Sequence, residues 1–86
     1  MSDEKLSDLK NIGAKSEALL NQVGIYTLAD LDAVGAVEAW KRVHEVAPSA
    51  NLVGVYALQG ALMNIHWNAI PQDIKDDLAN QWHRQQ

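Results

Sequence analysis

The fold is decided by residues 9–36, which read LKNIGAKSEALLNQVGIYTLADLDAVGA. This stretch holds two turns of similar form, Asn11-Ile12-Gly13-Ala14 and Ala33-Val34-Gly35-Ala36, each with an apolar residue before a glycine. The apolar side chain can enter a core while the glycine adopts a backbone conformation that is closed to most residues. The pattern predicts short helices joined by glycine turns, with a weak internal repeat.

Local end signals divide this stretch into helices. Apolar residues at helical spacing predict a helix over residues 14–22, and Gly24 follows it at the position where glycine commonly ends helices. Thr27-Leu28-Ala29-Asp30 has the form of a capping box, in which Thr27 and Asp30 each bind the other's backbone N–H. It predicts the start of a short helix that ends before Gly35.

Three longer helices are predicted downstream. The first covers residues 36–47 and stops at Pro48; the last begins at Pro71 and carries one apolar stripe. Between them, Asn51 is a suitable N-cap for a helix over residues 52–65, which is apolar on one side and lined by small residues on the other. We expect this to be the central helix. The predicted stripes are Val37, Trp40, Val43 and Ala47; Leu52, Val55, Leu58, Leu62 and Ile65; and Ile74, Leu78 and Trp82.

The expected fold is all-α: one domain over residues 1–86, a compact bundle of five to six short helices with helix-hairpin-helix-like turns. The chain has three Trp, two Tyr and no Phe, so we expect these five residues to supply much of the bulky burial. Gly54 and Gly60 inside the central helix each cost about 1 kcal/mol relative to Ala. Close packing within a monomer would explain that cost, and we favour a monomer; a dimer interface is the alternative.

Composition narrows the functional classes. There is no Cys, which rules out thiolate metal sites and a cysteine nucleophile. The polar opening residues 1–5 and the lack of a long apolar run predict no signal peptide, no membrane association and a cytoplasmic protein. The net charge is −4 and no segment is basic, which argues against strong nucleic-acid binding because such binding depends on neutralising phosphates.

The glycine turns nevertheless offer a candidate phosphate or DNA contact. Helix-hairpin-helix modules bind DNA through N–H groups of the turn, aimed at phosphate oxygens. Both turns here lack the first glycine of such a hairpin, which is replaced by Asn11 and Ala33, and acidic residues flank both. We therefore favour structural turns over DNA contact. The candidate contact residues are Lys10, Asn11, Gly13, Lys15, Lys41 and Arg42.

Catalytic or metal chemistry is not predicted. A zinc site needs three or four converging ligands, and His44, His66 and His83 have no such spacing; we expect His66 to pack or cap at a helix end. The neighbours Asp76 and Asp77 point different ways on a helix and are expected to be solvated. Residues 13–16, GAKS, match only the end of a phosphate-binding loop. We expect no enzyme activity and no cofactor.

An ordered set of residues matches a known family: Leu9, Asn11–Gly13, Ser16–Glu17, Leu19–Leu20, Gly24–Ile25, Thr27, Asp30–Leu31, Gly35–Val37, Ala39–Trp40, Ala57–Leu62, His66–Trp67 and Ile70–Pro71. This set is similar to the C-terminal domain of the TfoX/Sxy competence regulators. The resemblance covers about residues 6–78. It implies a small helical domain, distantly like the C-terminal domain of RNA polymerase α, and a link to bacterial transcriptional control of DNA uptake. The regulators' usual N-terminal domain has no counterpart in this sequence, so we expect a stand-alone copy.

Two functional hypotheses follow. The first is a non-enzymatic regulatory or adaptor domain that acts through an unidentified protein partner, linked to bacterial transcription or competence. The alternative is a weak, non-specific DNA-binding helix-hairpin-helix domain.

Overall fold

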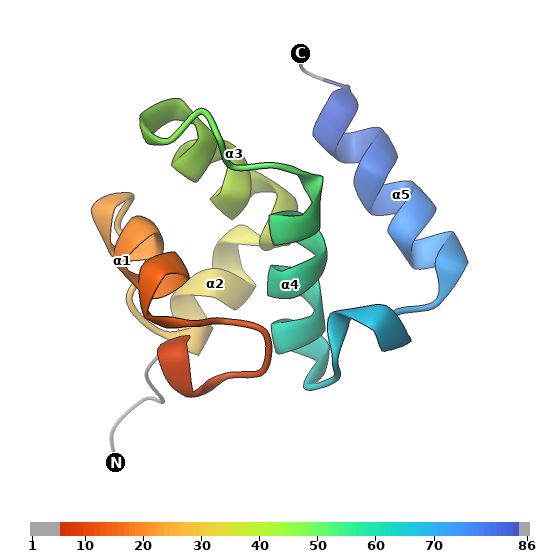
Figure 1. Cartoon of the computed structure of the whole chain (residues 1–86), viewed down its shortest axis with the longest axis horizontal. Helices are drawn as coiled ribbons and strands as arrows, with labels where there is room; N and C mark the ends of the chain where they lie inside the picture. The colour runs from red at the N-terminus through yellow and green to blue at the C-terminus, as the bar shows by residue number, and fades with distance from the viewer. Residues whose placement is uncertain (1–5, 85–86) are drawn as a thin grey trace.

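In residues 6–84, which the computed structural model describes, five α-helices and two 3₁₀-helices follow one another with short connections and no β-strand (Figure 1). The all-α prediction is therefore confirmed. Expectations for residues 1–5 lie outside the described residues. The elements are η1 (Leu6–Asp8), α1 (Ala14–Gln22), α2 (Leu28–Val34), α3 (Ala36–Val46), α4 (Leu52–Met63), η2 (Trp67–Ala69) and α5 (Gln72–His83).

Local signals set the ends of α1 and α2 as predicted. Gly24 has φ +85°, and the backbone N–H groups of Gly24 and Ile25 donate to the carbonyls of Asn21 and Leu20. This pattern is a Schellman motif, which satisfies the last carbonyls of α1. The capping box also forms: Asp30 N donates to Thr27 Oγ1 at 3.1 Å, and Thr27 N donates to Asp30 Oδ2 at 3.2 Å. The backbone N–H groups of Thr27 and Asp30 at the start of α2 are thereby both paired.

Helix α4 is central, as predicted, and packs against α2, α3, α5 and η2. Figure 1 shows it in the middle of the molecule, with α1 and α5 on opposite sides. Asn51 caps its start by accepting from Val53 N at 3.2 Å. Its end falls two residues before the predicted Ile65, because Asn64 takes the left-handed conformation at φ 58°, ψ 41°.

The core is mainly aliphatic. The largest fully buried side chains are all Leu, Ile or Val. The prediction of aromatic burial is confirmed for Trp40 and Trp82, whereas Tyr26 is 59% exposed and that part of the prediction was wrong. The core cluster consists of Leu6, Ile12, Leu20, Ile25, Leu31, Ala36, Ala39, Trp40, Val43, Val55, Leu58, Ala61, Leu78 and Trp82.

Both glycines of α4 lie at close contacts inside the chain. A Cβ at Gly54 would overlap ring atoms of Trp40 in α3, and one at Gly60 would overlap the side-chain nitrogen of Asn11 and the carbonyl oxygen of Ile65. Glycine therefore lets a ring and a turn approach the helix backbone. The small-residue side of α4 serves packing within the monomer at these two positions.

The two glycine turns differ in conformation, which corrects the predicted repeat. Gly35 has φ +90°, as expected, but Gly13 has φ −99° and ψ −176°, an extended conformation open to any residue. In the first turn it is Asn11 that takes positive φ, at 70°. The turns therefore share sequence without sharing backbone form, and helix-hairpin-helix-like geometry is not confirmed.

Candidate functional site

Asn11, one of the predicted phosphate contacts, is occupied by internal hydrogen bonds. Its Nδ2 lies 3.0 Å from the carbonyl oxygen of Ile65 and 3.4 Å from that of Ala57, and its Oδ1 accepts from Trp67 N at 3.3 Å. These bonds join the η1–α1 connection to the end of α4 and the start of η2. Asn11 is thus a structural tie, and its amide is not free to bind a phosphate.

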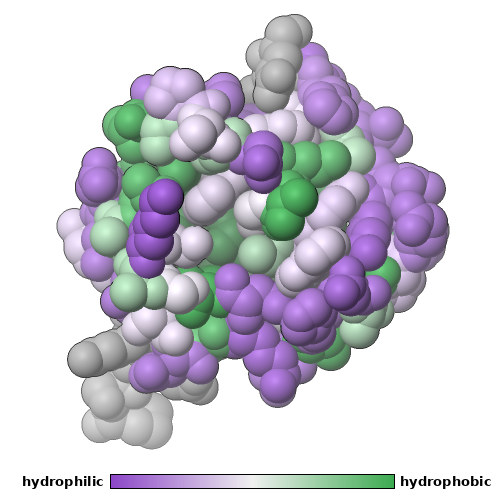
Figure 2. Space-filling view, viewed as in Figure 1, coloured by the Kyte–Doolittle hydropathy of each residue, from purple (hydrophilic) through white to green (hydrophobic). Residues whose placement is uncertain are grey.

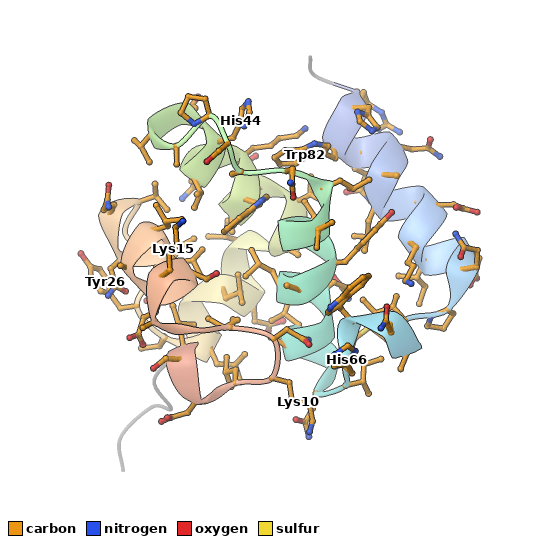
Figure 3. The ribbon with its side chains drawn as sticks, in the orientation of Figure 1. Lys10, Lys15, Tyr26, His44, His66 and Trp82 are labelled. Atoms are coloured by element: carbon orange, nitrogen blue, oxygen red, sulfur yellow. The ribbon has the colours of Figure 1, made fainter. Side chains whose placement is uncertain are left out.

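The other residues of the first turn do not converge on one point. Gly13, Lys10 and Lys15 are exposed, and Figure 3 shows Lys10 at the lower edge of the molecule and Lys15 well above it on α1. An acid also lies beside this turn, since Glu17 Oε2 accepts from the backbone N–H of Ser7 at 3.1 Å.

Lys41 and Arg42, the second pair of predicted cations, also lie in different surroundings. Arg42 Nε lies 3.2 Å from Glu38 Oε2, an exposed i,i+4 ion pair on α3. Lys41 instead lines a groove elsewhere on the molecule. None of the described residues of the η1–α1 connection is among the residues that line it. The six predicted contact residues therefore do not form one site.

This groove, which we call the α3–α5 groove, is a concavity on the surface of the described chain. It has a volume of about 460 Å³ and lies where the α2–α3 turn, α3, α4 and α5 meet. Its lining combines apolar side chains with charges of both signs and two amides. The lining residues are Val34, Gly35, Ala36, Val37, Glu38, Lys41, Gln59, Ile74, Asp77, Leu78, Gln81 and Arg84.

The charges on the groove are not equivalent. Each carboxylate has a neighbour: Glu38 is paired with Arg42, and Asp77 Oδ2 accepts from Gln81 Nε2 at 2.7 Å. The side chains of Lys41 and Arg84 have no hydrogen-bond or ion-pair partner within residues 6–84. The groove therefore presents two uncommitted cations beside an apolar lining.

Sequence reasoning missed the groove because its residues serve the core as well. Val37, Ile74 and Leu78 were correctly placed on inward stripes, and all three pack on the core cluster or belong to it. Their outer atoms also line the groove. Apolar periodicity identifies the inward side of each helix, but it does not show where two helices leave space between them.

A second cluster joins α4, η2 and α5 through aromatic rings. Tyr56 and Trp67 are stacked at 6.3 Å between centroids, and the Nζ of Lys75 lies 5.7 and 5.3 Å from those rings. His66 stacks on Trp67 and caps η2 by accepting from Asn68 N at 3.1 Å, which confirms its predicted capping role. Lys75 is thereby engaged in cation–π contacts.

The other histidines are separate from this cluster. His44 Nδ1 lies 3.0 Å from the carbonyl oxygen of Ala50, and its ring meets Trp82 edge-on at 5.6 Å (Figure 3). Within residues 6–84, no three His, Asp or Glu side chains lie close enough to hold a metal ion. No helix in this range is both long and apolar enough to cross a membrane.

The geometry defines a small all-α domain with a groove between two of its helices. The chain belongs to the TfoX C-terminal domain family, whose model matches residues 2–82. It is similar to Protein Sxy of Escherichia coli (strain K12), with 33% identity over 76 residues, which make up 88% of this chain and 36% of Sxy. The chain thus spans about a third of the length of that relative.

Two crystal structures from Listeria monocytogenes share the fold. A triclinic form matches with a TM-score of 0.86 and 36% identity, covering 90% of this chain and 88% of that one. A tetragonal form gives a TM-score of 0.83 and 37% identity, covering 88% and 94% respectively. These likenesses extend over nearly the whole domain.

Proposed function

We propose that this chain is a non-enzymatic adaptor domain that binds a protein partner through the α3–α5 groove, in regulation linked to bacterial competence. The observation that supports it is the composition of the groove: its apolar side chains are buried or partly buried, and they lie among charged and amide groups, of which Glu38, Asp77 and Arg84 are exposed. Protein interfaces combine an apolar centre with a polar rim in the same way. The domain would act in the cytoplasm as a monomer until it meets its partner.

The regulatory part of the proposal rests on the family. The chain resembles the C-terminal part of the competence regulators, and it covers about a third of Sxy. In a longer regulator such a domain would connect the rest of the protein to its target. A domain that contributes contacts alone would need no cofactor and no converging acid–base set.

Weak DNA binding is the alternative, supported by the exposure of Lys10 and Lys15 beside the start of α1. The internal bonds of Asn11 and the neighbouring Glu17 oppose it. The surface seen in Figure 2 mixes hydrophilic and hydrophobic residues, and the whole chain carries a net charge of −4. Non-specific DNA affinity depends on cations, so the negative net charge favours a protein partner.

An NMR titration with short duplex DNA at low salt separates the two functions. The adaptor function predicts no shifts at residues 10–15 or 35–42. Shifts clustered there that disappear as salt is added would show DNA contact and contradict the proposal. A tagged copy of the chain should in parallel retain a protein from its native cytoplasm, and the Lys10→Glu/Lys15→Glu variant should retain the same protein.

A further inference from the structure

We infer that the α3–α5 groove takes an acidic amphipathic helix of the partner protein, with apolar side chains on its base and carboxylates at Lys41 and Arg84. This inference rests on the proposed adaptor function and adds the chemistry of the segment that is bound. It is carried by three features of the groove: its length, its apolar base and its uncommitted charges.

The length of the groove suits a helix. Along α5 it is lined from Ile74 to Arg84, ten positions apart. At about 1.5 Å per residue this corresponds to roughly 15 Å, or about three helical turns. The opposite side is the first half of α3, from Ala36 to Lys41. A groove between two helices is the usual receptor for the apolar face of a third.

The base of the groove supplies apolar contacts. Val37 and Ile74 are only partly buried and pack against the core from opposite helices. Val34, Ala36 and Leu78 complete the apolar lining. Leu, Ile or aromatic side chains at positions i and i+3 or i+4 of a partner helix would remove the exposed parts of these residues from water.

The charged side chains on the groove indicate which charge the bound segment of the partner carries. Glu38 is held by Arg42 and Asp77 by the amide of Gln81, whereas Lys41 and Arg84 have no bond to another described residue. Carboxylates that flank the partner's apolar stripe would pair with these two cations without displacing a bond already made. The charge of Glu38 is already offset by Arg42, so a basic partner would find only Asp77 as an acid without a cationic partner, against the two cations that an acidic partner finds. Charge complementarity therefore favours an acidic segment.

Selection of random peptides of roughly 11 residues or more on the folded chain tests this inference. We expect the recovered peptides to combine Asp or Glu with large apolar residues at helical spacing. A synthetic copy of the strongest binder should shift NMR signals of Val37, Lys41, Ile74 and Arg84. Recovery of Lys- or Arg-rich peptides, recovery of none, or shifts confined to other surfaces would overturn it.

Charge reversal supplies the matched comparison. Lys41→Glu/Arg84→Glu should weaken binding of that peptide by roughly tenfold or more, since two charge-assisted contacts are lost. Lys10→Glu/Lys15→Glu changes the net charge equally, away from the groove, and should alter binding less than about twofold, because exposed charges beyond a Debye length are largely screened. Equal loss in both double variants would contradict the inference, as would duplex DNA binding that is lost only with Lys41 and Arg84. Circular dichroism confirms that each variant is folded.

Failure here is distinguishable from failure of the adaptor function. If a natural protein partner still binds the Lys41→Glu/Arg84→Glu variant with full affinity, the adaptor function stands and the acidic helix in this groove is wrong. If the chain binds duplex DNA through residues 10–15 and retains no protein, the adaptor function itself is wrong.

Discussion

The indole ring of Trp40 in α3 lies against the backbone of Gly54 in α4, and its Nε1 donates a 2.8 Å hydrogen bond to the carbonyl oxygen of Asn51. This contact joins α3 to the start of the central helix. Trp40 is only 6% exposed, and its ring is fixed by the contact with Gly54 and by the hydrogen bond from Nε1. The position of α3, and with it one side of the α3–α5 groove, depends on this pair.

Gly54→Ala should therefore destabilise the fold, although alanine normally stabilises a helix interior by about 1 kcal/mol relative to glycine. The added Cβ would overlap the Trp40 ring, and overpacking of this kind costs about 1–3 kcal/mol. Urea unfolding measures the change. In a Trp40→Ala background the same substitution should lose most of its cost, and equal costs in the two backgrounds would show that the ring is not responsible.

Trp40→Ala and Trp67→Ala should differ in their effect on stability. Trp40 is buried, so its loss should cost about 3–5 kcal/mol. Trp67 is half-buried and stacks on Tyr56 near the surface, so its loss should cost on the order of 1–2 kcal/mol, mainly through the ring contacts. Thermal or urea unfolding of the two variants provides the comparison, and equal losses would contradict the burial described.

Replacements of Asn11 should separate hydrogen bonding from backbone strain. Asn11→Gly keeps the positive φ of 70° and loses only the side-chain bonds, with an expected cost of about 1–3 kcal/mol. Asn11→Ala loses the same bonds and, unlike Asn11→Gly, keeps a Cβ in the left-handed region. It should therefore cost about 1–2 kcal/mol more than Asn11→Gly. Identical unfolding midpoints for the two variants would argue against the left-handed turn.

The capping box of α2 allows a conservative comparison. Thr27→Ala removes the hydroxyl that accepts from Asp30 N and should cost about 0.5–2 kcal/mol. Thr27→Ser retains an acceptor and should stay close to the parent chain. Urea midpoints distinguish them, and a serine variant as unstable as the alanine variant would mean that the methyl group, not the hydroxyl, stabilises this end.

The helices could be predicted from the sequence because their ends are set by nearby residues. Thr27 and Asp30 are three positions apart, Gly24 ends α1 through carbonyls a few residues before it, and Asn51 caps α4 through Val53. Each of these signals is local and carries its own physical cause. The boundary at Ile65 was predicted two residues late because Asn64 was not expected to take the left-handed conformation, and that of α3 was predicted one residue late.

The site could not be predicted because it depends on contacts between distant segments. Asn11 bonds to Ile65 and Trp67, 54 and 56 residues away, and nothing in its own turn shows that its amide is occupied. The presence of Lys41 and Arg84 on one groove likewise depends on the packing of α3 beside α5. The sequence identified Lys41 as a candidate phosphate contact and gave no sign that it lines a groove with Arg84.

The most direct test of partner binding at the α3–α5 groove is NMR mapping of a bound protein partner on the isotope-labelled chain. We predict shifts concentrated at Val37, Lys41, Ile74, Leu78 and Arg84, weakened by Lys41→Glu/Arg84→Glu and unaffected by Lys10→Glu/Lys15→Glu. Shifts at residues 10–15 with duplex DNA, and none at the groove with any protein partner, would contradict the claim that this domain acts through the α3–α5 groove.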